Sequence, residues 1–374
     1  MKRWRKHTQQ QKIPIKNKDQ NGNAESVFPF LYEVDCVEKV TIFNRSFRLH
    51  KDNVTFRFWL KKSVIILNKI MLKIILKQSC ESAESAGRDR MKTMNLLFSI
   101  NRGCVHLLQS CLKSIEQKGG AESYEVYVLH SDLTPEDKMT VLATGLKGMQ
   151  YHFVSVPEEM FQGFPVTKRY PEQIYYRLAA PVLLPEDLDR ILYLDVDTII
   201  INSLQSLYES EFGDDWFMAC TNTGEHLTRL NRIRLGVDVD EDVPYVNTGV
   251  LLMNLEQLRI HLKLEDIQAY AQDKKEMLIL PDQDILTALY GDHVKILERM
   301  VYNLSDRTLI AHNADLRNTR VDLEWVRKYA VIIHYFGRNK PWHDVYAGIL
   351  DVFYHETVAL LQKENLCGDG RKTG

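Results

Sequence analysis

Several common functional signals are missing from this sequence of 374 residues. Its six cysteines form no C-x-x-C pair and no metal-site spacing, so they indicate reduced intracellular thiols and no disulfide framework. A long polar and basic stretch follows Met1, so no signal peptide is predicted. No G-x-G-x-x-G and no Walker P-loop follows a predicted strand, which weighs against dehydrogenases and nucleoside triphosphatases.

The charge is unevenly distributed along the chain. With 45% hydrophobic residues, the chain can build a substantial core, as one large domain or two ordinary ones. Residues 1–93 contain 20 Lys and Arg against 9 Asp and Glu, which leaves 28 against 41 for residues 94–374. An acidic main body argues against an enzyme with a basic nucleic-acid-binding face, so we predict no nucleic-acid partner.

The front segment is polar, apart from one apolar stretch. Residues 1–26 are rich in Lys, Arg, Gln and Asn and are predicted to lack fixed structure. Residues 63–77 are mostly apolar, but lysines recur every four residues, so a helix there would carry a basic stripe. Such a segment is too short and too charged to span a bilayer. It suits peripheral contact with an anionic membrane surface. The alternative, which we favour, is that it packs on the body or has no function of its own.

We predict a division of the chain into three parts. Residues 1–93 form a basic, partly disordered extension. Alternatively, they precede the native start, because Met91 and Met94 stand directly before the first predicted strand. Residues 94–364 form the main domain, and residues 365–374 form a flexible tail.

From Asn95 onward, strand-like and helix-like patterns alternate. Strands are predicted at 95–100, 125–130 and 151–156, and helices at 105–117, from Thr134-Pro135 onward, and at 173–184. This alternation predicts an α/β protein with a mainly parallel sheet and right-handed crossovers. In open sheets of this kind, ligands bind beyond the carboxyl ends of the strands.

Two aspartates, Asp195 and Asp197, follow the apolar run 191–194. Such a run predicts a strand that is buried on both faces. A buried carboxylate is costly unless it is paired or bound to a cation. Two carboxylates one residue apart at the end of a strand can converge on Mg²⁺ or Mn²⁺, which prefer hard oxygen ligands. The alternative is a turn with two solvated aspartates.

The second half contains three more polar signals. A strand at 245–254 begins near Asn247, and Pro281-Asp282-Gln283-Asp284 precedes an apolar helix at 285–290. A strand at 330–335 contains His334 and leads into a loop with Gly337 and Lys340.

These residue types suit a site for a metal and a diphosphate. An imidazole can complete a Mn²⁺ site that two carboxylates begin. A glycine lets backbone N–H groups approach a phosphate, and a lysine adds a point charge. The alternative is a set of unrelated surface loops.

The ordered segments ILYLDVDTII, YVNTGVLLMN, LPDQDIL and HYFGRNKPW closely resemble glycosyltransferase family 8. That family includes bacterial lipopolysaccharide galactosyl- and glucosyltransferases and the glycogenin-like enzymes. The resemblance covers residues 94–354. It implies a GT-A fold, which is a Rossmann-like mixed, mostly parallel sheet flanked by helices. It also implies a UDP-sugar donor, Mn²⁺ or Mg²⁺ as cofactor, and retention of configuration at the anomeric carbon.

The resemblance also implies roles for single residues. Metal ligation falls to three residues, Asp195, Asp197 and His334. Contacts to the donor fall to Asn101, Arg177, Asn247, Gly337 and Lys340, and the reacting sugar lies beside Asp282 and Gln283. Gln283 corresponds to the side chain nearest the anomeric carbon. Because glutamine is a poor nucleophile and Asp282 is not established as one, we favour front-face attack over a covalent intermediate.

The implied function is a hexosyltransferase that moves glucose or galactose from UDP-glucose or UDP-galactose to a carbohydrate or glycolipid acceptor. We predict a cytoplasmic location, and contact of residues 63–77 with the inner face of the membrane is left open as an alternative. The acceptor would contact residues 221–244, which include Asn222, but the charges of this segment equally suit a solvated helix face.

One segment departs from the family pattern. The family usually has D-[DN]-N-[YF] after the first strand, where this chain has Asn101-Arg102-Gly103-Cys104. Asn101 can still bond to the nucleoside, but the carboxylate and the aromatic ring are missing. This departure favours a second hypothesis, a non-catalytic nucleotide-sugar-binding homologue. A third hypothesis is a metal-dependent nucleotidyltransferase. Its basic phosphate loop is missing near the first strand, apart from Arg102.

Overall fold

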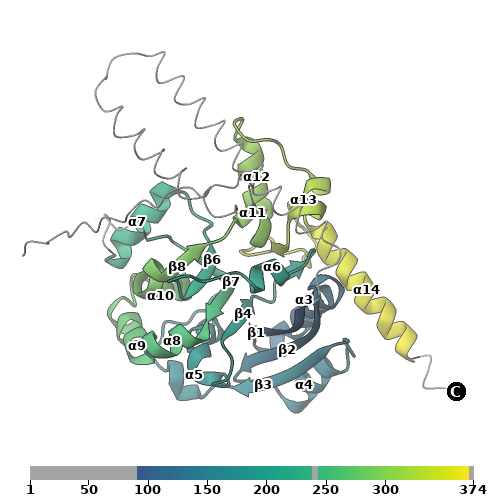
Figure 1. Ribbon diagram of the computed structural model, residues 1–374, viewed down its shortest axis with the longest axis horizontal. Helices are drawn as coiled ribbons and strands as arrows, with labels where there is room; N and C mark the ends of the chain where they lie inside the picture. The colour runs from purple at the N-terminus through teal and green to yellow at the C-terminus, as the bar shows by residue number, and fades with distance from the viewer. Residues whose placement is uncertain (1–90, 238–242, 370–374) are drawn as a thin grey trace, which may run out of the picture. The chain divides into compact units, whose positions relative to one another are not determined.

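The computed structural model describes residues 91–237 and 243–369 (Figure 1). The predictions for residues 1–90, including the segment 63–77, lie outside the described residues. Across the described ranges, no helix has both the length and the apolar character needed to cross a membrane.

A seven-stranded sheet has the order β3-β2-β1-β4-β7-β6-β8. The parallel part contains β1 (Met91–Ser99), β2 (Ala121–His130), β3 (Met149–Ser155) and β4 (Arg190–Leu194). Strand β7 (Asn247–Asn254) runs antiparallel to β4 and to β6 (Phe217–Cys220), and β8 (Val294–Ile296) runs parallel to β6. The predicted mixed, mostly parallel sheet is therefore confirmed.

Strand β1 begins three residues before the predicted domain boundary. Met91 pairs with Ala121 and Thr93 with Ser123, so the parallel ladder extends to Met91. The side chains of Lys92 and Thr93 are exposed, which is why the apolar pattern does not reveal this part of the strand. A chain that started at Met94 would lack these pairs.

Helices cover both faces of the sheet, with one core on each side. The first core joins alternate β1 residues, such as Leu96 and Phe98, to α3 (Val105–Lys118). The second core joins Leu97 and Tyr193 to helices on the opposite face. Those helices are α5 (Ala180–Leu183), α8 (Leu255–His261), α9 (Leu264–Asp273) and α10 (Pro281–Tyr290). Strand β4 contributes to both cores, which explains its uninterrupted apolar run.

The predicted helix at 173–184 is instead broken into short turns. The structure has 3₁₀ turns at Glu172–Ile174 and Tyr176–Ala179, followed by α5. Pro181 has no N–H group and cannot donate to a carbonyl one turn earlier, which favours a break at this point. The single-helix prediction is therefore wrong.

The apolar run after the aspartates belongs to a second, two-stranded sheet. Strand β5 (Thr198–Ile200) pairs antiparallel with β9 (Ile332–His334), and Thr198 lies opposite His334. The backbone N–H of Tyr335 continues this pairing by donating to the carbonyl oxygen of Asp197, at 2.9 Å. This register brings His334 beside the aspartates, although 137 residues separate it from Asp197.

A third core lies around this small sheet and includes Ile199, Ile333 and Phe353. The helices of the C-terminal part are α11 (Arg299–Tyr302), α12 (Asp306–Ala314), α13 (Leu323–Tyr329) and α14 (Asp351–Asp369). Helix α14 continues to Asp369, and residues 370–374 lie outside the described residues, so the flexible tail at 365–374 stays a prediction. The remaining helices are α4 (Pro135–Leu142), α6 (Gln205–Tyr208) and α7 (Glu225–Leu235).

The start of α4 is set by a capping box, as the Thr134-Pro135 pair predicts. The N–H of Asp137 donates to Thr134 Oγ1 at 3.2 Å, and the N–H of Thr134 donates to Asp137 Oδ2 at 2.9 Å. We expect Thr134→Ala to lower the free energy of unfolding by about 1 kcal/mol. Thr140→Ala, on the exposed face of the same helix, should change it by less than about 0.5 kcal/mol. Urea denaturation of both variants measures the difference, and equal losses would contradict this account of the cap.

Candidate metal centre

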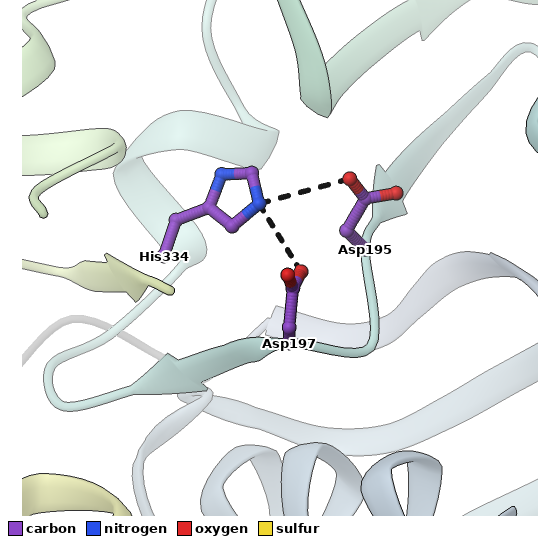
Figure 2. Close-up of side chains that lie close together, drawn as sticks. All are labelled: Asp195, Asp197 and His334. Carbon is purple, nitrogen blue, oxygen red and sulfur yellow. Dashed lines mark ion pairs between the residues drawn. The ribbon is translucent and has the colours of Figure 1, made fainter. Parts of the chain in front are cut away.

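Asp195, Asp197 and His334 converge at the carboxyl end of β4 (Figure 2). The two aspartates lie in the connection between β4 and β5, and His334 ends β9. Nε2 of His334 is 3.7 Å from Oδ2 of Asp195 and 3.1 Å from Oδ1 of Asp197. One potential ligand atom from each residue lies within 4.8 Å of the others. The structure therefore brings together the three residues that the sequence suggested as metal ligands.

The donor set fits a divalent cation. His334 is 1% exposed, and its Nε2 atom is buried without a hydrogen-bond partner among the described residues. Leaving a buried polar atom unsatisfied is costly, and a cation beside the two carboxylates would remove that cost. Two carboxylates and one imidazole suit Mn²⁺, and also Mg²⁺.

Gly249 of β7 has no side chain, and this leaves room for Asp195 and His334 to come together. A Cβ atom at this position would lie 2.2 Å from Cε1 of His334 and 2.6 Å from Oδ2 of Asp195. The Gly249 carbonyl also accepts a hydrogen bond from the N–H of Asp195, at 2.8 Å. Sequence reasoning did not single out this residue. The signal was a glycine inside a buried strand, which often marks a close approach of other groups.

Arg177 and Tyr193 both contact the carboxylate of Asp195. Arg177 Nη2 lies 3.0 Å from Oδ1 of Asp195, and the Tyr193 hydroxyl donates to the same oxygen at 2.7 Å. The guanidinium also stacks over the Tyr193 ring, 4.3 Å from its centroid. Burial alone would lower the pKa of Arg177, but the charges of Asp195 and Asp282 raise it, so the guanidinium stays charged. Arg177 was expected beside the donor, and the structure connects it directly to the aspartates.

Asp282 and Gln283 lie in the first turn of α10 and have different surroundings. Asp282 is buried, 3.5 Å from Arg177 Nη1, and accepts from the Thr248 hydroxyl at 2.6 Å. Burial raises the pKa of Asp282, against the lowering effects of Arg177 and Thr248. The Gln283 side chain has no hydrogen-bond partner within residues 91–237 and 243–369, so it is available to a ligand.

Asp284, in the same turn, has a structural role. Its carboxylate accepts from Arg234 at 2.7 and 2.9 Å, from the Tyr245 hydroxyl at 2.7 Å and from the N–H of Ile279 at 2.7 Å. These bonds connect α10 to α7 and to the approach to β7. Of the polar residues in this turn, Gln283 alone is left without a partner in the described structure.

The loop after β9 curls over Asp197. The Lys340 ammonium contacts Asp197 Oδ2 and donates to the Tyr335 carbonyl at 2.8 Å. Burial would raise the pKa of Asp197, but the neighbouring His334 and the ammonium of Lys340 outweigh it and lower the pKa well below its usual range. Gly337 has a φ of +90°, which favours glycine, and a Cβ there would lie 3.3 Å from Nη2 of Arg307.

The segment Asn101-Arg102-Gly103-Cys104 follows β1 at the same edge of the sheet. Strands β1 and β4 pair in parallel, with Leu97 opposite Tyr193, so the segments that follow these two strands leave the sheet side by side. Arg102 is turned to α4, where its Nε donates to Asp137 at 2.8 Å. The Asn101 side chain is half-buried and makes no hydrogen bond to another described residue.

The family model for glycosyl transferase family 8 matches residues 91–346. This chain belongs to glycosyltransferase family 8. Its fold is accordingly GT-A, as the resemblance implied. The three converging residues, the first turn of α10 and the loop after β9 all lie within the matched range.

Individual relatives in family 8 act on related sugars. The lipopolysaccharide 1,2-glucosyltransferase of Escherichia coli is 27% identical over 68% of this chain and 75% of its own length. The lipopolysaccharide 1,3-galactosyltransferase of Salmonella typhimurium is 23% identical over 67% of this chain and 73% of its own. The galactosyltransferase LgtC, solved with donor and acceptor sugar analogues, has a TM-score of 0.60 and 26% identity over 71% of this chain and 95% of its own.

Filling the space at Gly249 should abolish metal binding. In Gly249→Ala, the new methyl group would push Asp195 and His334 apart, so we expect Mn²⁺ affinity to fall by at least about 100-fold. Titration calorimetry with Mn²⁺ measures the change. The matched control is Gly224→Ala, because a Cβ there meets nothing within 4 Å, and its affinity should equal that of the wild type. Unchanged binding by folded Gly249→Ala would rule out a cation between these residues.

Proposed function

We propose that this family 8 enzyme transfers a hexose, glucose or galactose, from a UDP-sugar to a carbohydrate or glycolipid acceptor, with retention of configuration. The observation that carries the proposal is the convergence of Asp195, Asp197 and the unpartnered Nε2 of His334, with Lys340 and Gln283 on neighbouring elements. The names of the glucosyl- and galactosyltransferase relatives support the substrate class.

The metal centre would serve the leaving group. Asp195, Asp197 and His334 would hold a Mn²⁺ or Mg²⁺ ion, which would supply a Lewis acid for the charge that develops on the departing UDP. Lys340 adds a positive charge at the same place. An ammonium group has three donors, and two are already directed to Asp197 and the Tyr335 carbonyl, so one remains for a phosphate oxygen.

Front-face attack by the acceptor would explain retention of configuration at the anomeric carbon better than a covalent intermediate would. A covalent intermediate needs an accessible nucleophile, but Asp282 is 5% exposed and is held by Arg177 and Thr248. Gln283 is not nucleophilic. Its free amide would instead lie beside an oxocarbenium-like sugar, while the leaving diphosphate helps to deprotonate the acceptor. A solved LgtC variant carries an active-site glutamine-to-glutamate substitution, which supports a comparable place for Gln283.

Further residues would contact the donor and the acceptor. Asn247, Arg177 and Asn101 would lie around the donor, and residues 221–244 would contact the acceptor. In that region, both amide atoms of Asn222 are buried without a hydrogen-bond partner in the described part of the chain, so they can bind a hydroxyl group. The cytoplasmic location at the inner face of the membrane stays a prediction.

The non-catalytic alternative rests on the segment after β1. Arg102 is engaged by Asp137, and no carboxylate occupies positions 101–104 to hold the nucleoside. The same engagement weakens the nucleotidyltransferase hypothesis, because Arg102 was its only basic group near β1. Asn101 keeps a free amide for the nucleoside, which favours the transferase.

Removing a metal ligand should abolish turnover. We expect Asp197→Ala and His334→Ala to lower Mn²⁺-dependent release of UDP from UDP-glucose or UDP-galactose by at least about 100-fold, because stabilisation of the leaving group is lost. Exposed Asp214 provides the control, and Asp214→Ala should keep full activity. Equal activity in all three variants would reject the metal assignment. Binding of UDP by the wild type without turnover on any donor would support the non-catalytic homologue.

Truncation of Gln283 should affect the chemical step more than binding. We expect Gln283→Ala to lower kcat by about 10- to 100-fold, while the Kd for UDP stays within about twofold, because UDP lacks the sugar that Gln283 would face. Steady-state kinetics and calorimetry with UDP measure the two effects. A weakened UDP affinity with an unchanged kcat would place Gln283 at the nucleotide instead.

A further inference from the structure

Asn303 is a buried residue that has no role in the reaction proposed above. It follows α11 and is 0% exposed. Its Oδ1 atom lies 2.7 Å from Nδ1 of His334, the ring nitrogen that faces away from the aspartates. Phe336 contacts the same ring at its edge, with centroids 5.2 Å apart, but offers no hydrogen-bonding atom.

Backbone pairing holds Asn303 at this distance. The next residue, Leu304, donates its N–H to the Ile332 carbonyl at 3.0 Å and accepts at 2.8 Å from the N–H of His334. The connection between α11 and α12 thus runs alongside β9, as the bridge between Leu304 and Ile333 also shows. Asn303 and His334 are therefore placed by the same ladder of backbone bonds.

The orientation of the Asn303 amide is determined by the backbone N–H of Gly249, whose direction is fixed by the strand. The backbone N–H of Gly249 donates to Asn247 Oδ1 at 3.3 Å, and the Nδ2 group of Asn303 donates to the same oxygen at 2.9 Å. Because a carbonyl oxygen only accepts, the nitrogen of Asn303 must face Asn247. Its oxygen must then face His334.

This orientation determines the state of the His334 ring. Oδ1 of Asn303 can only accept, so the proton of a neutral imidazole resides on Nδ1. The lone pair is then on Nε2, the buried atom that points to Asp195 and Asp197 and has no hydrogen-bond partner in the described structure. A ring in the other tautomer would present an N–H to the cation and could not bind it.

We propose that Asn303 is a positioning residue of the metal centre. Through the series Gly249, Asn247, Asn303 and His334, it holds the imidazole in the tautomer and rotation that bind a divalent cation. Asn247 then has two tasks, because its Oδ1 anchors this series while its own amide nitrogen stays free for the donor sugar. The inference rests on the metal-binding role of the proposed function.

Two substitutions separate positioning from packing. Asn303→Leu keeps the volume but removes both hydrogen bonds, and we expect it to weaken Mn²⁺ affinity by about 10- to 100-fold. Asn303→Asp keeps an acceptor for Nδ1 but loses the donor to Asn247, so its Mn²⁺ affinity should lie between that of the wild type and that of Asn303→Leu. Asn313→Leu is the control, because Asn313 bonds both the N–H and the carbonyl of Val321, away from the cluster. It should lower the melting temperature and leave Mn²⁺ affinity unchanged.

The tautomer can be observed without metal. Long-range ¹H–¹⁵N spectra at about pH 8 should show His334 protonated at Nδ1 in the wild type, and in a mixture of tautomers in Asn303→Leu. His334→Ala assigns the signals. If Asn303→Leu does not fold, Asn303→Ser, whose hydroxyl is too short to reach Nδ1, takes its place with the same expectation.

The outcomes distinguish this inference from the proposed function. Wild-type Mn²⁺ affinity and an unchanged Nδ1–H signal in folded Asn303→Leu would overturn the positioning role and leave the function standing. Absence of Mn²⁺ binding by the wild type would overturn the function, and the ring spectra would still decide whether Asn303 sets the tautomer.

Discussion

Two carboxylates that meet beside a buried imidazole impose the main constraint on this structure. Asp195 and Asp197 repel each other, and their side chains are only 29% and 16% exposed, so water screens them only in part. Each aspartate is paired with a positively charged side chain. Arg177 contacts Asp195, and Lys340 contacts Asp197. These pairs neutralise the aspartates but leave the space between them open. In the proposed function, a divalent ion bound there would therefore add net positive charge where a diphosphate would lose its sugar.

The fold serves this constraint through its two sheets. Strand β4 delivers the aspartates from the large sheet, and the pairing of β5 with β9 returns His334 to the same place. Gly249 then keeps β7 from filling the gap. Membership in family 8 places these features in an enzyme class, and the charge pattern is consistent with the diphosphate leaving group of the proposed function. The departure at positions 101–104 would affect the nucleoside side of the proposed site and does not involve Asp195, Asp197 or His334.

Much of this arrangement could be predicted from sequence. The apolar run before Asp195 predicted a strand buried on both faces, because only such a strand excludes polar residues from both sides. The capping pair at Thr134 marked a helix start, since its groups interact within one turn. Predictions failed where the signal was weak. Exposed Lys92 and Thr93 hid the start of β1, and a proline broke the expected helix near Pro181.

By itself, the sequence determined the fold class and the identity of the three converging residues, because these depend on local periodicity and on motifs that stay contiguous. The tertiary structure alone decided how those residues are held. Asn303 and Gly249 lie 31 and 85 residues from His334, on different elements, and no local pattern connects them. Their roles follow from the register of β9 and from the bond of the Gly249 N–H to Asn247, which in turn orients the Asn303 amide, and both are properties of packed chains in three dimensions.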